Sequence, residues 1–392
     1  MRMGEDGRKE RLAHLGREER RRLLCSEHPD LADSLARAED PALLSDLSEK
    51  MIENSISFFA LPFGVAENFL IDAAALSVPM VTEEPSVVAA ASFAAGLIRL
   101  GGGFTTEAKE AELAAQVFLE QVPETFCQNG LDQAEREALD AQLGALAGQV
   151  LPSLIARGGG FAGSSISALS GIPGVVRADL RLRVCDAMGA NMANTFAEAA
   201  RKLLEDRTGG RALAAILTNE CALRLAEARF SLPVKLLRRA GQKGEEIARR
   251  LMLLSEVAHH DRARAITANK GVMNGITALA LATGNDTRAV EAAAHAWASR
   301  SGRYLPLTRY GLDRGRLTGE IILPLPLASA SSMAGLHPGA LFSLSLLGSP
   351  SAPRLAAIAA ALGLAQNLAA LLALVGEGIQ AGHMRLHTRR TP

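Results

Sequence analysis

Hydrophobic and polar positions follow two different spacings along this chain, and each spacing predicts one kind of element. In residues 8–50, apolar side chains recur at helical spacing between charged ones, and Pro29 and Pro41 interrupt them, which predicts a lead-in of surface helices. The next stretch, residues 51–69, has the composition of extended chain and turns, and residues 78–81 are predicted to be a short strand. The first part of the chain therefore predicts helices followed by sheet.

The clearest strand pattern covers residues 176–185, where apolar residues alternate with mostly charged ones. One charged face and one apolar face indicate a half-exposed strand, so the sheet is predicted to be antiparallel. The strand runs into a turn that contains Asp186, Met188, Gly189 and Asn191, and then into a predicted helix. A strand, a tight turn and a helix N-terminus in succession form a good site for a pyrophosphate group. An ordinary strand–helix connection explains the same pattern equally well.

A glycine-rich stretch invites a dinucleotide-binding interpretation, which its flanks argue against. Residues 105–157 are predicted to be helices broken at Pro123 and Gly130. Residues 158–163 match the G-x-G-x-x-G pattern of Rossmann folds, but that pattern needs a strand before it and a helix after it. Residues 149–157 have helical spacing, and no helix start follows the glycines. We therefore interpret this stretch as a loop and exclude a Rossmann fold on this motif.

The second half of the chain alternates between the same two spacings. Residues 212–234 predict two strands, residues 241–254 a helix and residues 317–327 another strand. Residues 356–375 form the longest apolar run, with two amide side chains near its middle. Amides are unfavourable at the centre of a membrane span, so a buried core helix is the better interpretation.

The stretch from Arg264 to Trp297 joins a lysine to an acid through an almost uncharged segment. Lys270 is flanked by glycine, which predicts a turn, and Asp286 stands at the start of an alanine-rich helix. Burying the lysine next to an apolar segment would cost several kcal/mol unless a carboxylate paired with it. The stretch therefore predicts that Lys270 is held near Asp286, with a second acid arriving from elsewhere in the chain.

Two further residues are candidates for chemistry. Glu84 precedes Pro85, which suits the first position of a helix, so Glu84 is predicted to stand at a helix N-terminus. His383 lies in a glycine-flanked tail. Taken alone, Glu84 and Asp286 are explained by ordinary helix capping and His383 by an exposed histidine. Their combination with Lys270 is what favours a functional site.

Composition excludes several classes of function. The 392 residues are 48% hydrophobic, which predicts a large core in two or three domains. The 42 basic and 42 acidic residues balance and only 4% of residues are aromatic, so nucleic acid and membranes are not expected partners. Four widely spaced cysteines form no CxxC pair, and the charged N-terminus lacks an apolar signal segment. We expect no metal site and a soluble, cytoplasmic protein.

The remaining chemistry favours reduction of a carbonyl group. The chain has no GxSxG or HExxH motif, so a serine hydrolase and a metalloprotease are disfavoured. A lysine can stabilise the oxyanion that hydride transfer creates, and an acid can protonate that oxyanion. A Schiff-base lyase that uses Lys270 is a less favoured alternative.

Several multi-residue motifs resemble those of the 3-hydroxy-3-methylglutaryl-coenzyme A (HMG-CoA) reductase family, in the same order along the chain. They are Glu53-Asn54-x-Ile56, Glu83-Glu84-Pro85-Ser86, Asp186-Ala-Met-Gly-Ala-Asn191, Asn269-Lys270-Gly-x-Met-Asn274-Gly275, Gly284-Asn285-Asp286 and Gly378-Ile-Gln-x-Gly382-His383-Met384. The resemblance covers about residues 50–388 and is most similar to the soluble, bacterial class II enzymes.

This resemblance implies an NAD(P)-dependent oxidoreductase. The expected reaction is the four-electron reduction of HMG-CoA to mevalonate and CoA, or the reverse oxidation. The expected fold is α+β, with a large mixed domain (residues 1–110 and 219–376) and a short C-terminal tail (377–392). A small dinucleotide-binding domain with a non-Rossmann, antiparallel sheet (111–218) is inserted between the two large-domain segments. A homodimer, or a larger oligomer built from dimers, completes the active site.

The resemblance also implies roles for individual residues. Lys270 stabilises the oxygen of the hemithioacetal and of mevaldehyde, and Glu84 donates the proton to it. Asp286 tunes this pair, and His383 protonates the CoA thiolate. The residues implied to hold the substrate are Ser86, Arg264, Asn219 and Asn274. The turn with Asp186, Met188, Gly189 and Asn191 binds NAD(H) or NADP(H), and the sequence does not decide between the two.

One departure from the family motivates an alternative function. The chain ends nine residues after His383, whereas class II enzymes usually carry a longer helical flap that closes the site. A catalytically weakened CoA- or dinucleotide-binding dimer of the same fold is therefore the alternative.

Overall fold

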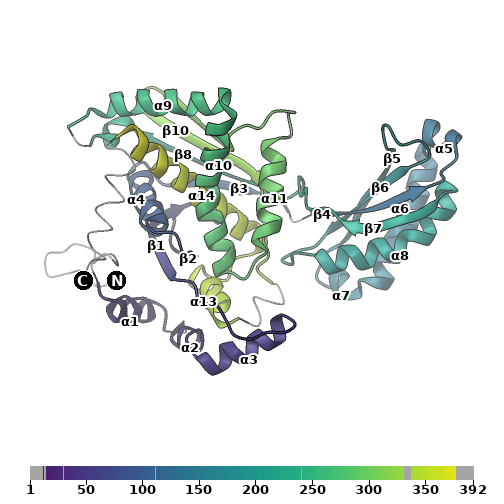
Figure 1. The fold of residues 1–392 in the computed structure, drawn as a ribbon, viewed down its shortest axis with the longest axis horizontal. Helices are drawn as coiled ribbons and strands as arrows, with labels where there is room; N and C mark the ends of the chain where they lie inside the picture. The colour runs from purple at the N-terminus through teal and green to yellow at the C-terminus, as the bar shows by residue number, and fades with distance from the viewer. Residues whose placement is uncertain are drawn as a thin grey trace.

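The computed structural model of the protein describes residues 12, 15–29, 31–110, 112–239, 241–330 and 337–376. These residues form two bodies, each built on its own β-sheet, and the bodies lie side by side in Figure 1. The larger sheet has six strands in the order β2-β1-β3-β8-β10-β9, and the smaller has four in the order β5-β6-β4-β7. Within the described residues the strand pairs are antiparallel except β1 with β3. Helices accompany both sheets, which confirms the predicted α+β class.

The larger sheet takes its strands from distant parts of the chain. They are β1 (Phe63–Ile71), β2 (Ala74–Val81), β3 (Phe104–Ala108), β8 (Leu225–Pro233), β9 (Thr308–Asp313) and β10 (Arg316–Pro324). The strands β3 and β8 pair with each other, although the whole smaller body lies between them in the sequence. The chain therefore leaves the larger sheet after β3, forms the smaller body, and returns to the larger sheet in β8, which is the neighbour of β3.

Five helices pack with this sheet. They are α4 (Val87–Leu100), α9 (Gly244–His260), α10 (Arg262–Ala282), α11 (Thr287–Ala298) and α14 (Ala352–Val375). The central one is α14, which contacts β3, β8 and β10 of the sheet as well as α4, α9 and α10. It is long and apolar enough to cross a membrane, but 83% of its most apolar window is buried inside the protein. The predicted core helix is therefore confirmed, four residues longer at its start.

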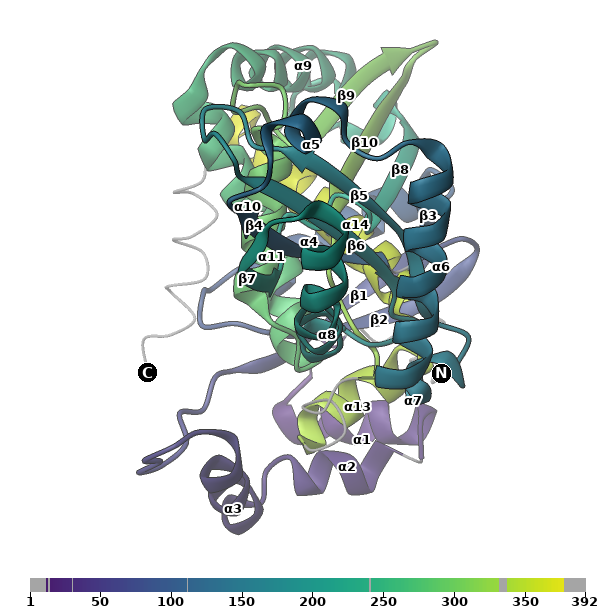
Figure 2. The ribbon, with the colours of Figure 1, turned by 90° about the vertical axis from the view of Figure 1, so that its right-hand side faces the viewer.

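The lead-in helices gather at one end of the larger body. They are α1 (Arg17–Glu27), α2 (Leu31–Arg37) and α3 (Pro41–Met51), and they lie near α13 (Pro338–Leu346) at the lower end in Figures 1 and 2. Leu24 and Leu31 from this segment form a small core with Phe342 and Leu346. The prediction of helices here is confirmed.

The smaller body combines four strands with four helices. They are β4 (Glu112–Glu120), α5 (Glu124–Asn129), α6 (Gln133–Val150), α7 (Pro152–Ile155), β5 (Gly160–Ala168), β6 (Val176–Arg183), α8 (Ala190–Thr208) and β7 (Arg211–Leu217). In β6 the apolar positions are buried and the charged ones are more exposed. The predicted half-exposed, antiparallel strand is therefore confirmed.

Two predictions for this region need correction. The strands β3 and β4 occupy most of residues 105–120, where helices were predicted; in β4, Leu113, Ala115, Val117 and Leu119 are buried and alternate with partly exposed positions at a spacing of two. The glycines of residues 158–163 follow the helix α7 and enter the strand β5, so the Rossmann order is absent as predicted. The prediction of a loop is wrong from Gly160 onward, where the chain pairs with β6.

The predicted turn at Lys270 is also wrong, because Lys270 lies inside the continuous helix α10. A Cβ added at Gly275 would come within 3.1 Å of Leu362 and 3.4 Å of Gln366, both on α14. Glycine at this position therefore serves the close approach of two helices instead of a turn.

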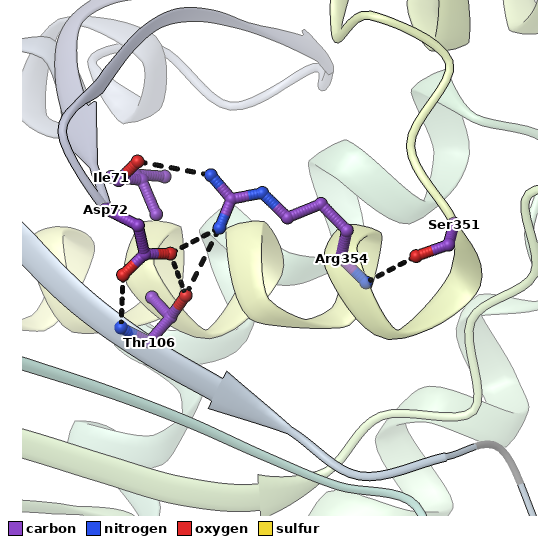
Figure 3. Close-up of polar contacts among 5 residues, drawn as sticks. All are labelled: Ile71, Asp72, Thr106, Ser351 and Arg354. Carbon is purple, nitrogen blue, oxygen red and sulfur yellow. Dashed lines mark hydrogen bonds and ion pairs between the residues drawn. The ribbon is translucent and has the colours of Figure 1, made fainter.

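A polar cluster ties the β1–β2 hairpin to β3 and to the first turn of α14 (Figure 3). Asp72 accepts hydrogen bonds from the backbone N–H and the hydroxyl of Thr106, at 2.8 and 2.6 Å. The guanidinium of Arg354 donates to the same carboxylate and, at 3.1 Å, to the carbonyl of Ile71. Burial alone raises the pKa of Asp72, but the hydrogen bonds from Thr106 and the charge of Arg354 outweigh burial and lower the pKa.

We expect the substitution Asp72→Asn to lower stability at neutral pH by about 1–2 kcal/mol, a value discounted for partial exposure. The pKa of Asp72 is lower in the folded chain than in the unfolded chain. The stabilisation is therefore present above the unfolded pKa of roughly 4 and is lost as the pH falls through the folded pKa. Thermal unfolding should show a difference in Tm between wild type and Asp72→Asn that is large at neutral pH and shrinks in acid.

The substitution Asp46→Asn is a matched control. Asp46 pairs with Lys50 at 2.6 Å one turn along α3, and both side chains are more than 60% exposed. Exposed pairs of this kind contribute little, so Tm should hardly change at any pH. A Tm difference for Asp72→Asn that is independent of pH would contradict the role given to its ionised carboxylate.

Candidate active site

The central feature of the site is an ion pair between Lys270 and Glu84. The ammonium Nζ of Lys270 lies 2.7 Å from Oε2 of Glu84 and donates a hydrogen bond to it. Lys270 comes from α10, and Glu84 from the loop before α4, so the pair joins residues 186 positions apart. The Lys270 side chain is 62% exposed and that of Glu84 40%. The expectation of a buried lysine is therefore wrong for the single chain, where the pair lies at the surface.

The residue at the start of α4 is strained and carries an unpaired hydroxyl. The helix begins at Val87 with Ser86 as its N-cap, so Pro85 does not occupy the first helical position as predicted. Ser86 has φ +75°, a left-handed conformation that costs a non-glycine residue about 1–3 kcal/mol. Its Oγ is buried and has no hydrogen-bond partner among the described residues. Strain and an unsatisfied polar atom two residues from Glu84 are typical of a binding site.

A second buried atom without a partner belongs to Arg264 in the first turn of α10. Its Nε is buried and makes no hydrogen bond within the described part of the chain. Asn274 follows Lys270 by four residues on the same helix and is therefore on the same face. Asn219 lies on an exposed bend between β7 and β8, and no described contact joins it to Lys270 or Glu84.

Asp286 is the N-cap of α11, as the sequence predicted. Its carboxylate accepts hydrogen bonds from the backbone N–H groups of Arg288 and Ala289 and from the Arg288 guanidinium, at 2.9 to 3.4 Å. Burial raises the pKa of Asp286, but the hydrogen bonds from Arg288 and Ala289 outweigh burial and lower the pKa. The acid that contacts Lys270 is therefore Glu84, while Asp286 is engaged by Arg288, a residue that the sequence interpretation missed.

A cavity of about 750 Å³ opens between the two bodies. Its lining includes Asp286 and Arg288, the end of α10, and the consecutive residues 187–192 of the smaller body. Lys270 and Glu84 are not part of this lining, but Lys270 stands on the helix whose C-terminal end contributes to it. The cavity is large enough for a cofactor-sized ligand.

The turn before α8 and the first residues of that helix line this cavity. The N-cap Gly189 has φ +90°, and no side chain caps the helix. A Cβ at Gly189 would lie 2.5 Å from Val184, so only glycine fits. The first N–H groups of a helix have no partner within the helix and attract anions. The three predicted cofactor residues Met188, Gly189 and Asn191 all line the cavity, and the site fits a diphosphate group.

Asp186 is placed differently from these three. It does not line the cavity, and its carboxylate accepts a hydrogen bond from the N–H of Ala352 at the start of α14, at 2.7 Å. Its carbonyl accepts from the N–H groups of Ser329 and Ala330, both at 3.0 Å. In this structure Asp186 attaches the turn to the larger body.

His337 is a cavity residue that the sequence interpretation did not select. Its Nδ1 accepts a hydrogen bond from the N–H of Gly339 at 3.1 Å, so a neutral imidazole carries its proton on Nε2. Burial lowers the pKa of His337, which favours that neutral form. The sequence signal for it is Pro338, because a proline suits the first turn of a helix and places His337 at the N-cap of α13.

His383 lies outside the described residues. Within the described ranges, no group of three or more histidine, cysteine, aspartate or glutamate side chains is placed to hold a metal ion.

The two-sheet α+β fold and the surface pair of Lys270 and Glu84 match a class of oxidoreductase that contains no classical Rossmann fold. A sequence profile of the hydroxymethylglutaryl-coenzyme A reductase family matches residues 16–388. The chain is 42% identical, over 346 residues, to the 3-hydroxy-3-methylglutaryl-coenzyme A reductase of Archaeoglobus fulgidus, covering 88% of this chain and 77% of that protein.

Solved structures show the same relationship. The 3-hydroxy-3-methylglutaryl-coenzyme A reductase from Streptococcus pneumoniae matches with a TM-score of 0.88 and 40% identity, over 96% of this chain and 90% of that chain. The class II enzyme from the same organism, bound to NADPH in open conformations, matches with a TM-score of 0.87 and 39% identity, over 93% of this chain and 98% of that chain. The chain belongs to the HMG-CoA reductase family, and it is a nicotinamide-dependent oxidoreductase that acts on HMG-CoA.

Proposed function

We propose that this protein carries out the reaction at the Lys270–Glu84 pair, reducing HMG-CoA to mevalonate and CoA in two hydride transfers or catalysing the reverse oxidation. The observation that carries this proposal is the 2.7 Å contact between two side chains 186 residues apart. Lys270 would stabilise the negative charge that forms on the thioester and aldehyde oxygens. Glu84 would deliver the proton to that oxygen.

The neighbouring polar residues would hold the substrate. The unsatisfied atoms of Ser86 and Arg264 support this role, because buried polar atoms without partners are rare unless a ligand supplies them. The guanidinium suits the substrate carboxylate and the hydroxyl suits the tertiary alcohol. Asn274 would complete the hydrogen-bond network from the same face of α10, and Asn219 would join it from the β7–β8 bend.

The dinucleotide would lie in the cavity, with its diphosphate at the N-terminus of α8 near Met188, Gly189 and Asn191. When bound there, it supplies the hydride. NADPH bound to the related Streptococcus pneumoniae enzyme supports NADP(H) as the cofactor, and NAD(H) is the alternative. Asp286 would keep its negative charge beside this cavity, since its pKa is lowered.

Further parts of the proposal concern the assembly. We assign residues 1–110 and 219–376 to a large domain, 111–218 to the dinucleotide-binding domain, and 377–392 to a tail in which His383 protonates the CoA thiolate.

A homodimer would cover the exposed Lys270–Glu84 pair and exclude water from it. Exposed apolar residues on the arm before β1, such as Ile56 and Phe59, at 99% and 90%, suit a buried interface. We expect the protein in the cytoplasm.

Initial rates test this function most directly. Oxidation of NADPH and of NADH should be followed with HMG-CoA, and reduction of NADP⁺ and of NAD⁺ with mevalonate and CoA. We expect turnover with at least one dinucleotide in at least one direction. Binding of dinucleotide and CoA without turnover would favour the alternative of a catalytically weakened binding protein. Borohydride trapping of a substrate adduct on Lys270 would instead support a Schiff-base lyase.

A further inference from the structure

Arg224 is a buried cation at the junction of the two bodies. It immediately precedes β8, only 4% of its surface is exposed, and its pKa falls to about 10 because burial removes it from water. At neutral pH it is still charged. Among the described residues its guanidinium donates to two backbone carbonyls and to no carboxylate: Met188 O at 3.1 Å and Leu327 O at 2.7 Å. Burying a cation with only carbonyl partners is unfavourable, which indicates a role beyond stability.

The two carbonyls belong to different bodies. Met188 lies in the turn before α8, in the smaller body, and Leu327 follows β10 in the larger one. Arg224 therefore fixes the orientation of one peptide unit, Met188–Gly189, against the larger body. In a trans peptide the C=O and N–H bonds point in opposite directions, and no cis peptide is present among the described residues. The N–H of Gly189 therefore points away from Arg224.

The same turn is held at a second point. Asp186 binds the N–H of Ala352 through its carboxylate and those of Ser329 and Ala330 through its carbonyl. With Asp186 attached on one side and Met188 on the other, the turn has a single orientation with respect to the cavity. Gly189 lines that cavity.

We propose that Arg224 is a positioning residue for the dinucleotide: by binding Met188 O it aims the N–H of Gly189 and the first turn of α8 at the diphosphate. This rests on the proposed function, which places the dinucleotide in the cavity. The charge of Arg224 also lies directly behind this peptide and adds to the positive potential at the helix N-terminus. Arg224 does not touch the dinucleotide itself.

The test is the Arg224→Met substitution, which keeps the length of the side chain and removes its charge and donors. We expect Kd and KM for NADPH to rise about tenfold, the loss of one charge-assisted hydrogen bond. KM for HMG-CoA should stay within about twofold, since it binds at the Lys270 side of the protein. The milder substitution Arg224→Lys keeps the charge but reaches only one carbonyl, so we expect a Kd for NADPH between those of wild type and Arg224→Met. This variant tests the role of Arg224 even if Arg224→Met does not fold.

Arg316→Met is the matched control. Arg316 pairs opposite Pro233 at the far end of β8, and its guanidinium also donates to backbone carbonyls, Ser231 O at 2.8 Å and Gly101 O at 3.2 Å. The substitution Arg316→Met should lower Tm without changing Kd for NADPH. An Arg224→Met protein that binds NADPH as wild type does would overturn the role of Arg224 and leave the proposed function standing. A wild-type protein that binds neither NADPH nor NADH would overturn both.

Discussion

Replacing Lys270 with methionine is expected to lower kcat for HMG-CoA reduction on the order of 10²–10³-fold and to leave the protein folded. The reason is electrostatic: hydride transfer places negative charge on an oxygen, and removing one preorganised positive donor costs this much in related cases. The Lys270 side chain is 62% exposed, so its loss creates no cavity and Tm should hardly change. Initial rates at saturating NADPH and HMG-CoA, together with thermal unfolding, measure both quantities.

The substitution Lys202→Met provides the control for the loss of a lysine. Lys202 on α8 is 78% exposed and pairs with Asp206 at 2.6 Å, so it matches Lys270 in exposure and in having one carboxylate partner. Its removal should leave kcat within about twofold of wild type. If Lys270→Met keeps an activity close to that of wild type, the ion pair has no catalytic role and is an ordinary surface salt bridge.

Replacing Glu84 with glutamine is expected to lower kcat on the order of 10²–10⁴-fold, the contribution usual for a positioned proton donor. Glutamine has nearly the same shape and can still accept a hydrogen bond from Lys270, but it has no acidic proton to deliver. KM for HMG-CoA and NADPH should change little, because the contact removed is made in the transition state. Rates measured across pH, in both directions of the reaction, test this.

Glu83→Gln is the control for this substitution. Glu83 is the adjacent acid, is exposed, and has no part in the contact with Lys270. A loss of activity limited to Glu84→Gln would assign the proton transfer to one carboxylate. Equal losses in the two variants would indicate a general effect of negative charge before α4 and would contradict the proposed role.

Local patterns predicted much of the fold. The alternation in residues 176–185 predicted β6, and the acid before an alanine-rich segment predicted Asp286 as the N-cap of α11. Both succeed because burial and capping depend on neighbours within a few residues. The alternation in β4 is equally local. It was missed because Ala114 and Ala115 occupy two of its positions, and alanine is a weak strand signal.

The glycines around Lys270 failed for a different reason. From the sequence they indicated a turn, whereas α10 continues through them because α14 lies against Gly275. Whether a glycine ends a helix or lets another helix approach depends on what lies across from it. The left-handed conformation of Ser86 and the buried position of Arg224 likewise have no local signature.

The sequence by itself determined the α+β class, the strand–turn–helix that faces the cavity, and the motifs that place the chain in the HMG-CoA reductase family. The tertiary structure decided which of the two expected acids contacts the lysine. The local pattern placed Lys270 near Asp286, sixteen residues away, with a second acid from elsewhere, and the family resemblance implied Glu84; Glu84 makes the contact from 186 residues away. The physical reason is that strand order and helix packing bring distant loops together, while the nearer acid is already engaged by Arg288 at the start of its own helix.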